Sequence, residues 1–169
     1  MIGVNETFPT FHMNGVEGEE IVTRNSSDYT GWRVFYFYPK DFTFICPTEI
    51  SDMDKLCDEA IVMGVSGDNE FCKLNWKMSN ELIGSIRHTL AADCGLVLTN
   101  TCEIVNMEQF VAERATFIID PEGVIQHTSM NAMDKEISKY IFKKVNILTP
   151  KYFVLNSKKF EKKNLKKSI

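Results

Sequence analysis

The chain has 169 residues, of which 44% are hydrophobic and 25% are charged, and its formal net charge is −4. This size and composition are typical of one soluble globular domain that buries a full core. The longest apolar runs are much too short to cross a membrane. Because residues 1–6 lack the basic region and long apolar core of a signal peptide, we expect a cytoplasmic location and no membrane association.

The first part of the chain contains one strongly predicted strand. Residues 1–31 are polar and rich in turns, and Phe8, Phe11 and Ile21–Val22 predict short edge strands there. Trp32–Tyr38 is apolar on both faces. Such a pattern is expected of a strand at the centre of a covered sheet.

One strand and three helices are predicted next. Apolar residues recur at helical spacing over 47–59, and residues 60–66 form a second apolar run that predicts a buried strand. Polar capping residues then open a helix over about 70–81. Residues 84–90 are predicted to form a loop, and residues 93–103 a short helix.

The last elements are a hairpin and a helix. Residues 113–120 predict a strand, and Pro121–Gly123 provides the turn into a second strand over 124–127. Residues 133–147 predict a closing amphipathic helix.

This element order predicts an α/β fold, a thioredoxin-like sandwich with a central mixed sheet covered by helices. Strand, helix, strand, helix implies a parallel crossover, and the hairpin adds antiparallel strands. No linker divides the chain, so residues 1–150 are predicted to form one domain. Residues 151–169 form a basic C-terminal tail. We expect this tail to be solvated and to bind no nucleic acid.

The cysteine pattern points to a reduced protein. The five cysteines form no Cys-x-x-Cys pair, and an odd number without a secretory signal argues against a disulfide framework. Structural zinc needs close ligand pairs, and His12, His88 and His127 are scattered, so no metal is predicted. What remains is a chain in which one thiol is reactive.

Cys46 is the candidate for that reactive thiol. Proline fits a helix only in its first turn, so Pro47 predicts that Cys46 lies at the N-terminal end of a helix. Unpaired N–H groups and the positive end of the helix dipole lower a thiol pKa there. Thr43 can turn its hydroxyl toward the thiolate or toward an oxygen bound beside it, and Pro39 stiffens and shields the loop.

A nucleophilic thiolate also needs a cation beside it. Arg33 and Arg114 flank predicted strands, and Lys40 is a third candidate. Arginine suits the task because it stays charged and has a planar fork of donors. From spacing alone, these residues indicate an activated cysteine and leave its substrate open.

The stretch Pro39–Glu49, with Pro-x-x-x-Thr-x-x-Cys at its centre, resembles the peroxidatic signature of the peroxiredoxins. Gly64–Asp68 followed by Trp76 resembles the strand and helix after that active site. Arg114–Gln126 resembles the strand that bears the family's arginine. The similarity covers roughly residues 5–145 and is strongest to the branch that contains the bacterial alkyl hydroperoxide reductase C component.

The resemblance implies a role for each matching residue. Cys46 would attack the terminal oxygen of a hydroperoxide and become a sulfenic acid. Thr43 would hydrogen-bond the peroxide and the thiolate, and Arg114 would lower the pKa of Cys46 and polarise the oxygen–oxygen bond. Pro39 would shield the pocket, and Glu49 would orient the arginine.

The resemblance also implies the wider function. We expect a thiol-dependent peroxidase, an oxidoreductase that reduces hydrogen peroxide and organic hydroperoxides with no metal, haem or flavin of its own. An external thiol or dithiol would be its reductant. Homodimers or higher homo-oligomers are expected. Within the subunit, Trp76 would either border the pocket or belong to the core.

One departure from the family leaves open how oxidised Cys46 is reduced back to the thiol. Typical members of this branch carry a resolving cysteine near the C-terminus, whereas no cysteine follows Cys102 here. An external thiol could reduce Cys46 directly, or Cys72, Cys94 or Cys102 could resolve it within the subunit. Of these, Cys72 is preferred. A divergent protein with weak turnover is the third alternative.

Two rival functions use the same residues. In the first, oxidation of Cys46 serves peroxide sensing or a holdase activity, and peroxide removal is incidental. In the second, Cys46 is an inert structural residue. Repeated turnover separates a peroxidase from the first rival, and a lowered thiol pKa separates it from the second.

Overall fold

The computed structural model describes residues 1–44 and 46–130. The helix predicted over 133–147 and the basic tail over 151–169 lie outside the described residues. No helix in the described part of the chain is long and apolar enough to cross a membrane.

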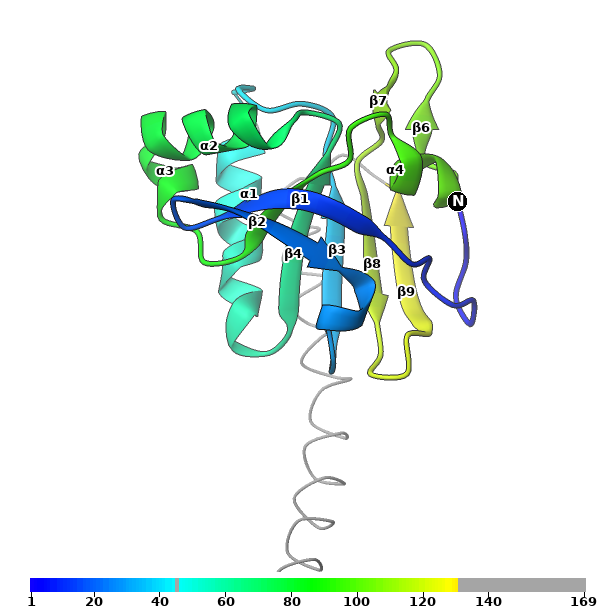
Figure 1. The fold of residues 1–169 in the computed structure, drawn as a ribbon. Helices are drawn as coiled ribbons and strands as arrows, with labels where there is room; N and C mark the ends of the chain where they lie inside the picture. Colours follow the sequence, from blue (N-terminus) through cyan, green and yellow to red (C-terminus); the bar gives the residue numbers. More distant parts are fainter. Residues whose placement is uncertain (45, 131–169) are drawn as a thin grey trace, which may run out of the picture.

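A seven-stranded sheet with the order β2-β1-β5-β4-β3-β8-β9 forms the centre of the fold (Figure 1). β3 pairs in parallel with β4, and β4 pairs in parallel with β5, whereas the other neighbours are antiparallel. The sheet is mixed, as predicted. Its strands are β1 His12–Glu17, β2 Glu20–Asn25, β3 Arg33–Phe37, β4 Ile61–Ser66, β5 Thr89–Ala92, β8 Ala115–Ile119 and β9 Ile125–Met130.

Helices cover both faces of this sheet. Side chains of α1, α2 and α3 pack with Val34 and Tyr36 on one face, whereas Leu98 of α4 packs with Phe35 and Phe37 on the other. Figure 1 accordingly shows α1, α2 and α3 grouped together and α4 near β8 and β9. The remaining elements are α1 Cys46–Asp54, α2 Glu70–Ser79, α3 Glu81–Gly84, α4 Val97–Thr101, the 3₁₀ turns η1 Ser26–Asp28 and η2 Lys55–Asp58, and the ribbon of β6 Val105–Asn106 with β7 Val111–Ala112.

The central strand confirms the two-sided apolar pattern. All five residues of β3 are buried, and successive side chains enter opposite cores because strand side chains alternate between faces. β3 therefore provides a rigid base for the loop that follows it, and that loop leads into α1.

The sequence missed one central strand. Residues 84–90 were expected to form a loop, but β5 begins at Thr89 and its four residues are buried between β1 and β4. The strand is short and ends in two alanines, which have low strand propensity. Its pairing on both sides holds it in the sheet, and single-sequence patterns do not reveal such pairing.

The N-terminal prediction was wrong in part. Phe8 and Phe11 lie outside the strands, where both rings contact the ring of Phe35 in the core. The strand there is β1, which begins one residue after Phe11 and pairs with β2. The edge strand at Ile21–Val22 is confirmed, because both residues belong to β2 at the edge of the sheet.

Candidate active site

The strand–loop–helix unit around Cys46 has the predicted backbone. β3 ends at Phe37, the amide of Tyr38 donates to the carbonyl of Val65 (3.0 Å), and α1 begins at Cys46. The prediction that Cys46 lies at the N-terminal end of a helix is confirmed. Backbone N–H groups without helical partners gather at this end, together with the positive end of the helix dipole.

A buried polar network holds the loop before Cys46. The Asp41 carboxylate accepts hydrogen bonds from the Tyr38 hydroxyl (2.8 Å), the Ser66 hydroxyl (3.1 Å) and the Lys73 ammonium group (3.2 Å). The side chains of Lys73 and Asp41 are only 0% and 1% exposed. In addition, the Asp41 amide donates to the Asp68 carboxylate (2.8 Å). The loop is thus tied to α2 and to the end of β4.

Replacing Lys73 with Met should lower the free energy of unfolding by about 3–5 kcal/mol, because the Asp41 carboxylate would stay buried without its cation. Lys55→Met is the matched control, since its partner is Asp52 and its side chain is 64% exposed. An exposed pair of that kind contributes about 0–1 kcal/mol. Urea denaturation of both variants checks the prediction, and equal losses in the two would contradict it.

Aromatic rings pack beside the same loop. Phe42 has a left-handed backbone (φ 56°), and its half-exposed ring lies 5.8 Å from the ring of Trp76. Trp76 is buried and also contacts Tyr38. Trp76 therefore belongs to the core and supports the active-site loop at the same time.

Arg114 and Glu49 form an ion pair between β8 and α1. Arg114 lies directly before β8, and its guanidinium donates to the carboxylate of Glu49 in the first turn of α1. Both side chains are mostly buried, with exposures of 19% and 9%. Arg114 and Pro39 also line one cavity of about 340 Å³, together with residues of the β6–β7 ribbon. Arg114 thus contacts Glu49 in the first turn of α1 and shares a cavity with Pro39.

The other candidate residues differ in their positions. Thr43 lies on the loop, and its hydroxyl is 3.5 Å from the carbonyl oxygen of Lys40. Lys40 is exposed. Arg33 is at the opposite end of β3, where its guanidinium donates to the carbonyl groups of Gly31 and Asp120. Arg33 is therefore not the cation beside Cys46.

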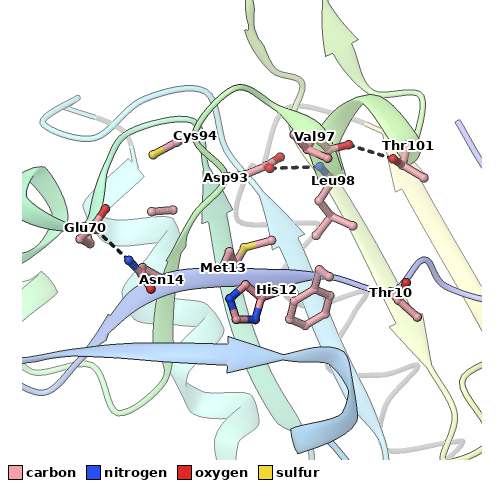
Figure 2. A pocket seen from close by; sticks show the side chains of 12 residues that line it. Thr10, His12, Met13, Asn14, Glu70, Asp93, Cys94, Val97, Leu98 and Thr101 are labelled. Atoms are coloured by element: carbon pink, nitrogen blue, oxygen red, sulfur yellow. Dashed lines mark hydrogen bonds between the residues drawn. The ribbon is translucent and has the colours of Figure 1, made fainter.

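Cys72 and Cys94 lie at the same edge of the sheet as the Cys46 loop, because both follow the carboxyl ends of parallel strands. Cys72 is on the first turn of α2 near Asp41. Burial, followed by the charges of Asp41 and Asp68, raises the pKa of Cys72. Cys94 is exposed and lines a separate cavity of about 470 Å³, in which Asn14 donates to Glu70 (Figure 2).

Cys57 and Cys102 lie away from this edge. Cys102 is fully buried on the α4 face of the sheet, and burial raises its pKa to about 12. Cys57 is half-buried in η2, beyond the other end of α1, and its pKa is also raised to about 12, mainly by burial and then by Asp54. Both thiols are therefore protonated at neutral pH.

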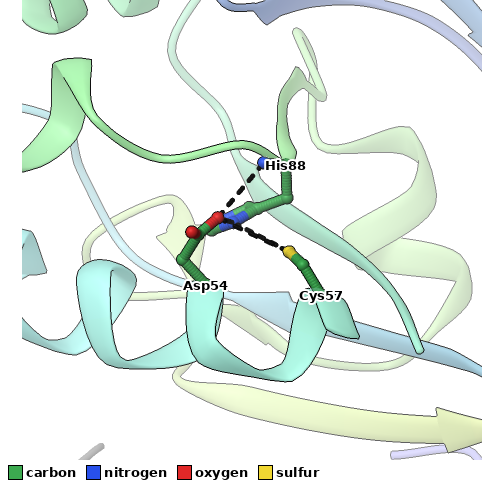
Figure 3. A group of neighbouring side chains, drawn as sticks. All are labelled: Asp54, Cys57 and His88. Carbon is green, nitrogen blue, oxygen red and sulfur yellow. Dashed lines mark hydrogen bonds and ion pairs between the residues drawn. The ribbon is translucent and has the colours of Figure 1, made fainter. Parts of the chain in front are cut away.

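Sequence reasoning missed the group formed by Asp54, Cys57 and His88. Its members lie at the end of α1 and in the loop before β5 (Figure 3). The spacing Asp54-x-x-Cys57 was visible in the sequence, but only the fold brings His88 to it. Burial opposes ionisation of Asp54, yet hydrogen bonds from His88 and Arg87 hold the pKa of this carboxyl well below its usual range.

The central strand of the mixed sheet leads through a short loop to a helix that begins at Cys46. Arg114, directly before the neighbouring strand β8, forms an ion pair with the first turn of that helix. This arrangement belongs to the thioredoxin-like class of folds. The AhpC/TSA family model matches residues 4–128, and the chain belongs to this family. It is a peroxiredoxin of the AhpC branch, an oxidoreductase that reduces peroxides with thiols.

Individual relatives agree with this assignment. The chain is 36% identical over 150 residues to alkyl hydroperoxide reductase C of Mycolicibacterium smegmatis, covering 78% of this chain and 76% of that protein. It is 33% identical over 135 residues to the Salmonella typhimurium protein of the same name, covering 76% and 72%.

Solved structures give the same result. AhpC of Enterococcus faecalis aligns with a TM-score of 0.80 at 28% identity, covering 90% of this chain and 94% of that one. AhpC of Mycobacterium tuberculosis aligns with a TM-score of 0.72 at 32% identity, covering 78% and 84%. The predicted family, fold class and enzyme class are confirmed.

Proposed function

We propose that Cys46 is the peroxidatic nucleophile of this enzyme. The observation that carries the proposal is the start of α1 at Cys46, next to the Arg114–Glu49 ion pair. The Cys46 thiolate attacks the terminal oxygen of a hydroperoxide, the oxygen–oxygen bond breaks, and the alkoxide or hydroxide leaves with that bond's electron pair. The leaving group then takes up a proton, and Cys46 becomes a sulfenic acid.

The neighbouring residues support this step in different ways. Arg114 stabilises the thiolate and the charge that develops on the leaving oxygen. Glu49 positions Arg114, because the two side chains share an ion pair. Thr43 provides a hydroxyl to the bound peroxide, and Pro39 shields the pocket whose wall it forms.

Reduction of the sulfenic acid requires a second thiol. We propose an external thiol as the reductant, with Cys72 as the internal candidate. Cys72 is close to Asp41 of the Cys46 loop, whereas Cys94 on the same edge lines a separate cavity and Cys102 is buried on the α4 face. Because the pKa of Cys72 is raised, resolution by Cys72 would be slow at neutral pH and would accelerate as the pH rises.

Intact-mass analysis after one equivalent of hydrogen peroxide tests the proposal. We expect one added oxygen on Cys46 in the reduced full-length chain, and its removal when an external thiol is added. Loss of two hydrogens with a Cys46–Cys72 disulfide would assign Cys72 as the resolver, and Cys72→Ser should then keep the added oxygen. Oxidation elsewhere with no change at Cys46 would contradict the proposal.

A homodimer or larger homo-oligomer is also proposed. Among the related solved structures is a Plasmodium yoelii Prx1a whose N-terminally modified form assembles into an artifactual octamer. Sedimentation velocity of the reduced and the peroxide-treated chain would measure the assembly state. A monomer at micromolar concentration in both states would refute this prediction.

A further inference from the structure

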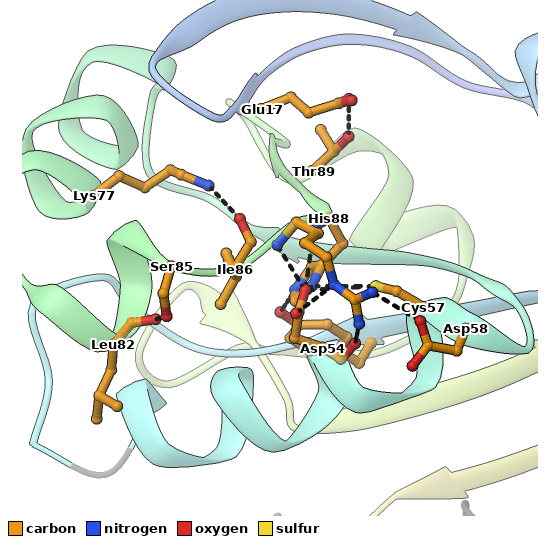
Figure 4. A network of polar contacts seen from close by, with 12 residues as sticks. Glu17, Asp54, Cys57, Asp58, Lys77, Leu82, Ser85, Ile86, His88 and Thr89 are labelled. Atoms are coloured by element: carbon orange, nitrogen blue, oxygen red, sulfur yellow. Dashed lines mark hydrogen bonds and ion pairs between the residues drawn. The ribbon is translucent and has the colours of Figure 1, made fainter.

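The polar group at the far end of α1 has no role in the peroxidase chemistry. Asp54 is the last residue of α1, Cys57 is on the following turn η2, and His88 directly precedes β5. Figure 3 shows the three side chains converging, and Figure 4 shows the polar contacts around them. We propose that Asp54, Cys57 and His88 form a Zn²⁺ site.

The distances between the three ligand atoms suit one metal ion. His88 Nδ1 is 2.8 Å from Asp54 Oδ1, Cys57 Sγ is 3.4 Å from the same oxygen, and Sγ is 3.9 Å from Nδ1. A point equidistant from these atoms lies about 2 Å from each, close to the usual lengths of zinc bonds to oxygen, nitrogen and sulfur. A tetrahedral ion would require His88 Nδ1 and Asp54 Oδ1 to move apart from 2.8 Å, because ligand atoms around tetrahedral zinc are more than about 3 Å from one another.

The donor types favour zinc among the common metal ions. One thiolate, one imidazole and one carboxylate form a mixed set that zinc accepts in tetrahedral sites, whereas Ca²⁺ and Mg²⁺ prefer oxygen ligands. The thiolate and the carboxylate carry two negative charges against the two positive charges of the ion, and Arg87 adds one positive charge beside Asp54. Binding would release the Cys57 thiol proton to solvent, since the thiolate is the ligand.

Neighbouring groups are placed to orient the ligands. The Tyr36 hydroxyl is 2.7 Å from His88 Nε2, so its oxygen can accept a hydrogen bond from the Nε2–H group when Nδ1 binds the ion. Arg87 donates from its backbone amide to Asp54 Oδ1 (2.7 Å) and from its guanidinium to Oδ2 (3.1 Å). These bonds fix the carboxylate. The Arg87 side chain is 54% exposed, which weakens its repulsion of a bound cation through solvent screening.

A fourth ligand position is available on the solvent side. Cys57 and His88 line a cavity of about 440 Å³ that is also bordered by Arg87 and Thr89. Three protein ligands with a water molecule in the fourth position are a common zinc arrangement. The bound ion would join the end of α1 to the chain before β5, on the side of the fold opposite the Cys46 end of the helix.

Cobalt titration of the reduced full-length chain provides the main test, because Co²⁺ replaces Zn²⁺ in such sites and reports thiolate ligation spectroscopically. We expect a near-ultraviolet thiolate-to-cobalt charge-transfer band that saturates at one equivalent and disappears when Zn²⁺ is added. Cys57→Ser should remove the band, whereas Cys72→Ser, Cys94→Ser and Cys46→Ser should keep it. Absence of the band in the unaltered chain, or its persistence in Cys57→Ser, would overturn the proposal.

A second measurement avoids any loss of folding in the variants. Iodoacetamide labelling of the unaltered chain, followed by peptide mass mapping, reports each cysteine separately. Zn²⁺ should slow alkylation of Cys57 at least about tenfold and leave Cys94 unchanged. Protection of other cysteines with Cys57 still reactive would refute the site. Neither readout uses peroxide, so the zinc site and the role of Cys46 can fail independently.

Discussion

Replacing Cys46 with Ser should lower kcat/KM for hydrogen peroxide by at least about 10³-fold, because a serine hydroxyl in place of the thiolate removes the proposed nucleophile. The change is nearly isosteric and falls at the first residue of α1, so the fold should be retained. Peroxide consumption with excess dithiothreitol measures the loss, and circular dichroism checks the fold.

Cys57→Ser is the matched control for this experiment. Cys57 lies beyond the other end of α1, away from the Cys46 loop, so its replacement in the metal-free chain should change kcat/KM by less than about twofold. Full activity in Cys46→Ser, or equal losses in both variants, would show that Cys46 is not the nucleophile.

Replacing Arg114 with Met should lower kcat/KM by about 10²–10³-fold, because one charged donor beside the reacting atoms is lost. The pH profile should change as well. The proposed role of Arg114 in stabilising the Cys46 thiolate predicts that the rise of kcat/KM with pH shifts to higher pH in this variant. Arg114→Lys should restore the charge but only part of the rate, because lysine lacks the planar fork of donors.

Two further variants show whether the effect is specific to the site. Glu49→Gln removes the carboxylate that holds Arg114 and should produce a smaller loss in the same direction. Arg24→Met breaks an arginine–glutamate pair with Glu17 on the β1–β2 hairpin and should leave the rate within about twofold. An unshifted pH profile in Arg114→Met would contradict the proposed role of the guanidinium.

Local patterns in the sequence were sufficient to predict the centre of the fold and the start of the active-site helix. The apolar run before Pro39 and the proline after Cys46 each determine backbone structure within a few residues. β5 was missed because Thr89–Ala92 has no strong strand pattern and is held by its neighbours in the sheet.

Long-range polar contacts were also beyond sequence reasoning. Lys73 lies on a helix, and lysine side chains on helices normally face solvent. Only the fold brings Lys73 to Asp41. His88 meets Asp54 across a similar separation in the chain. In contrast, position beside a predicted strand made Arg114 only one of three candidate cations, and the family resemblance selected it. The same resemblance implied that Glu49 orients the arginine, and the structure contains this ion pair.

The ion pair beneath the active-site loop has a consequence for how the sequence can diverge. A neutral residue at position 73 alone would leave the Asp41 carboxylate buried without a counterion. A neutral residue at position 41 alone would leave the ammonium group of Lys73 buried without a counterion. Well-packed apolar or neutral residues at both positions could replace the pair with little loss of stability. Positions 41 and 73 are therefore expected to covary among relatives, and an enzyme with a neutral residue at one of them should carry a neutral residue at the other.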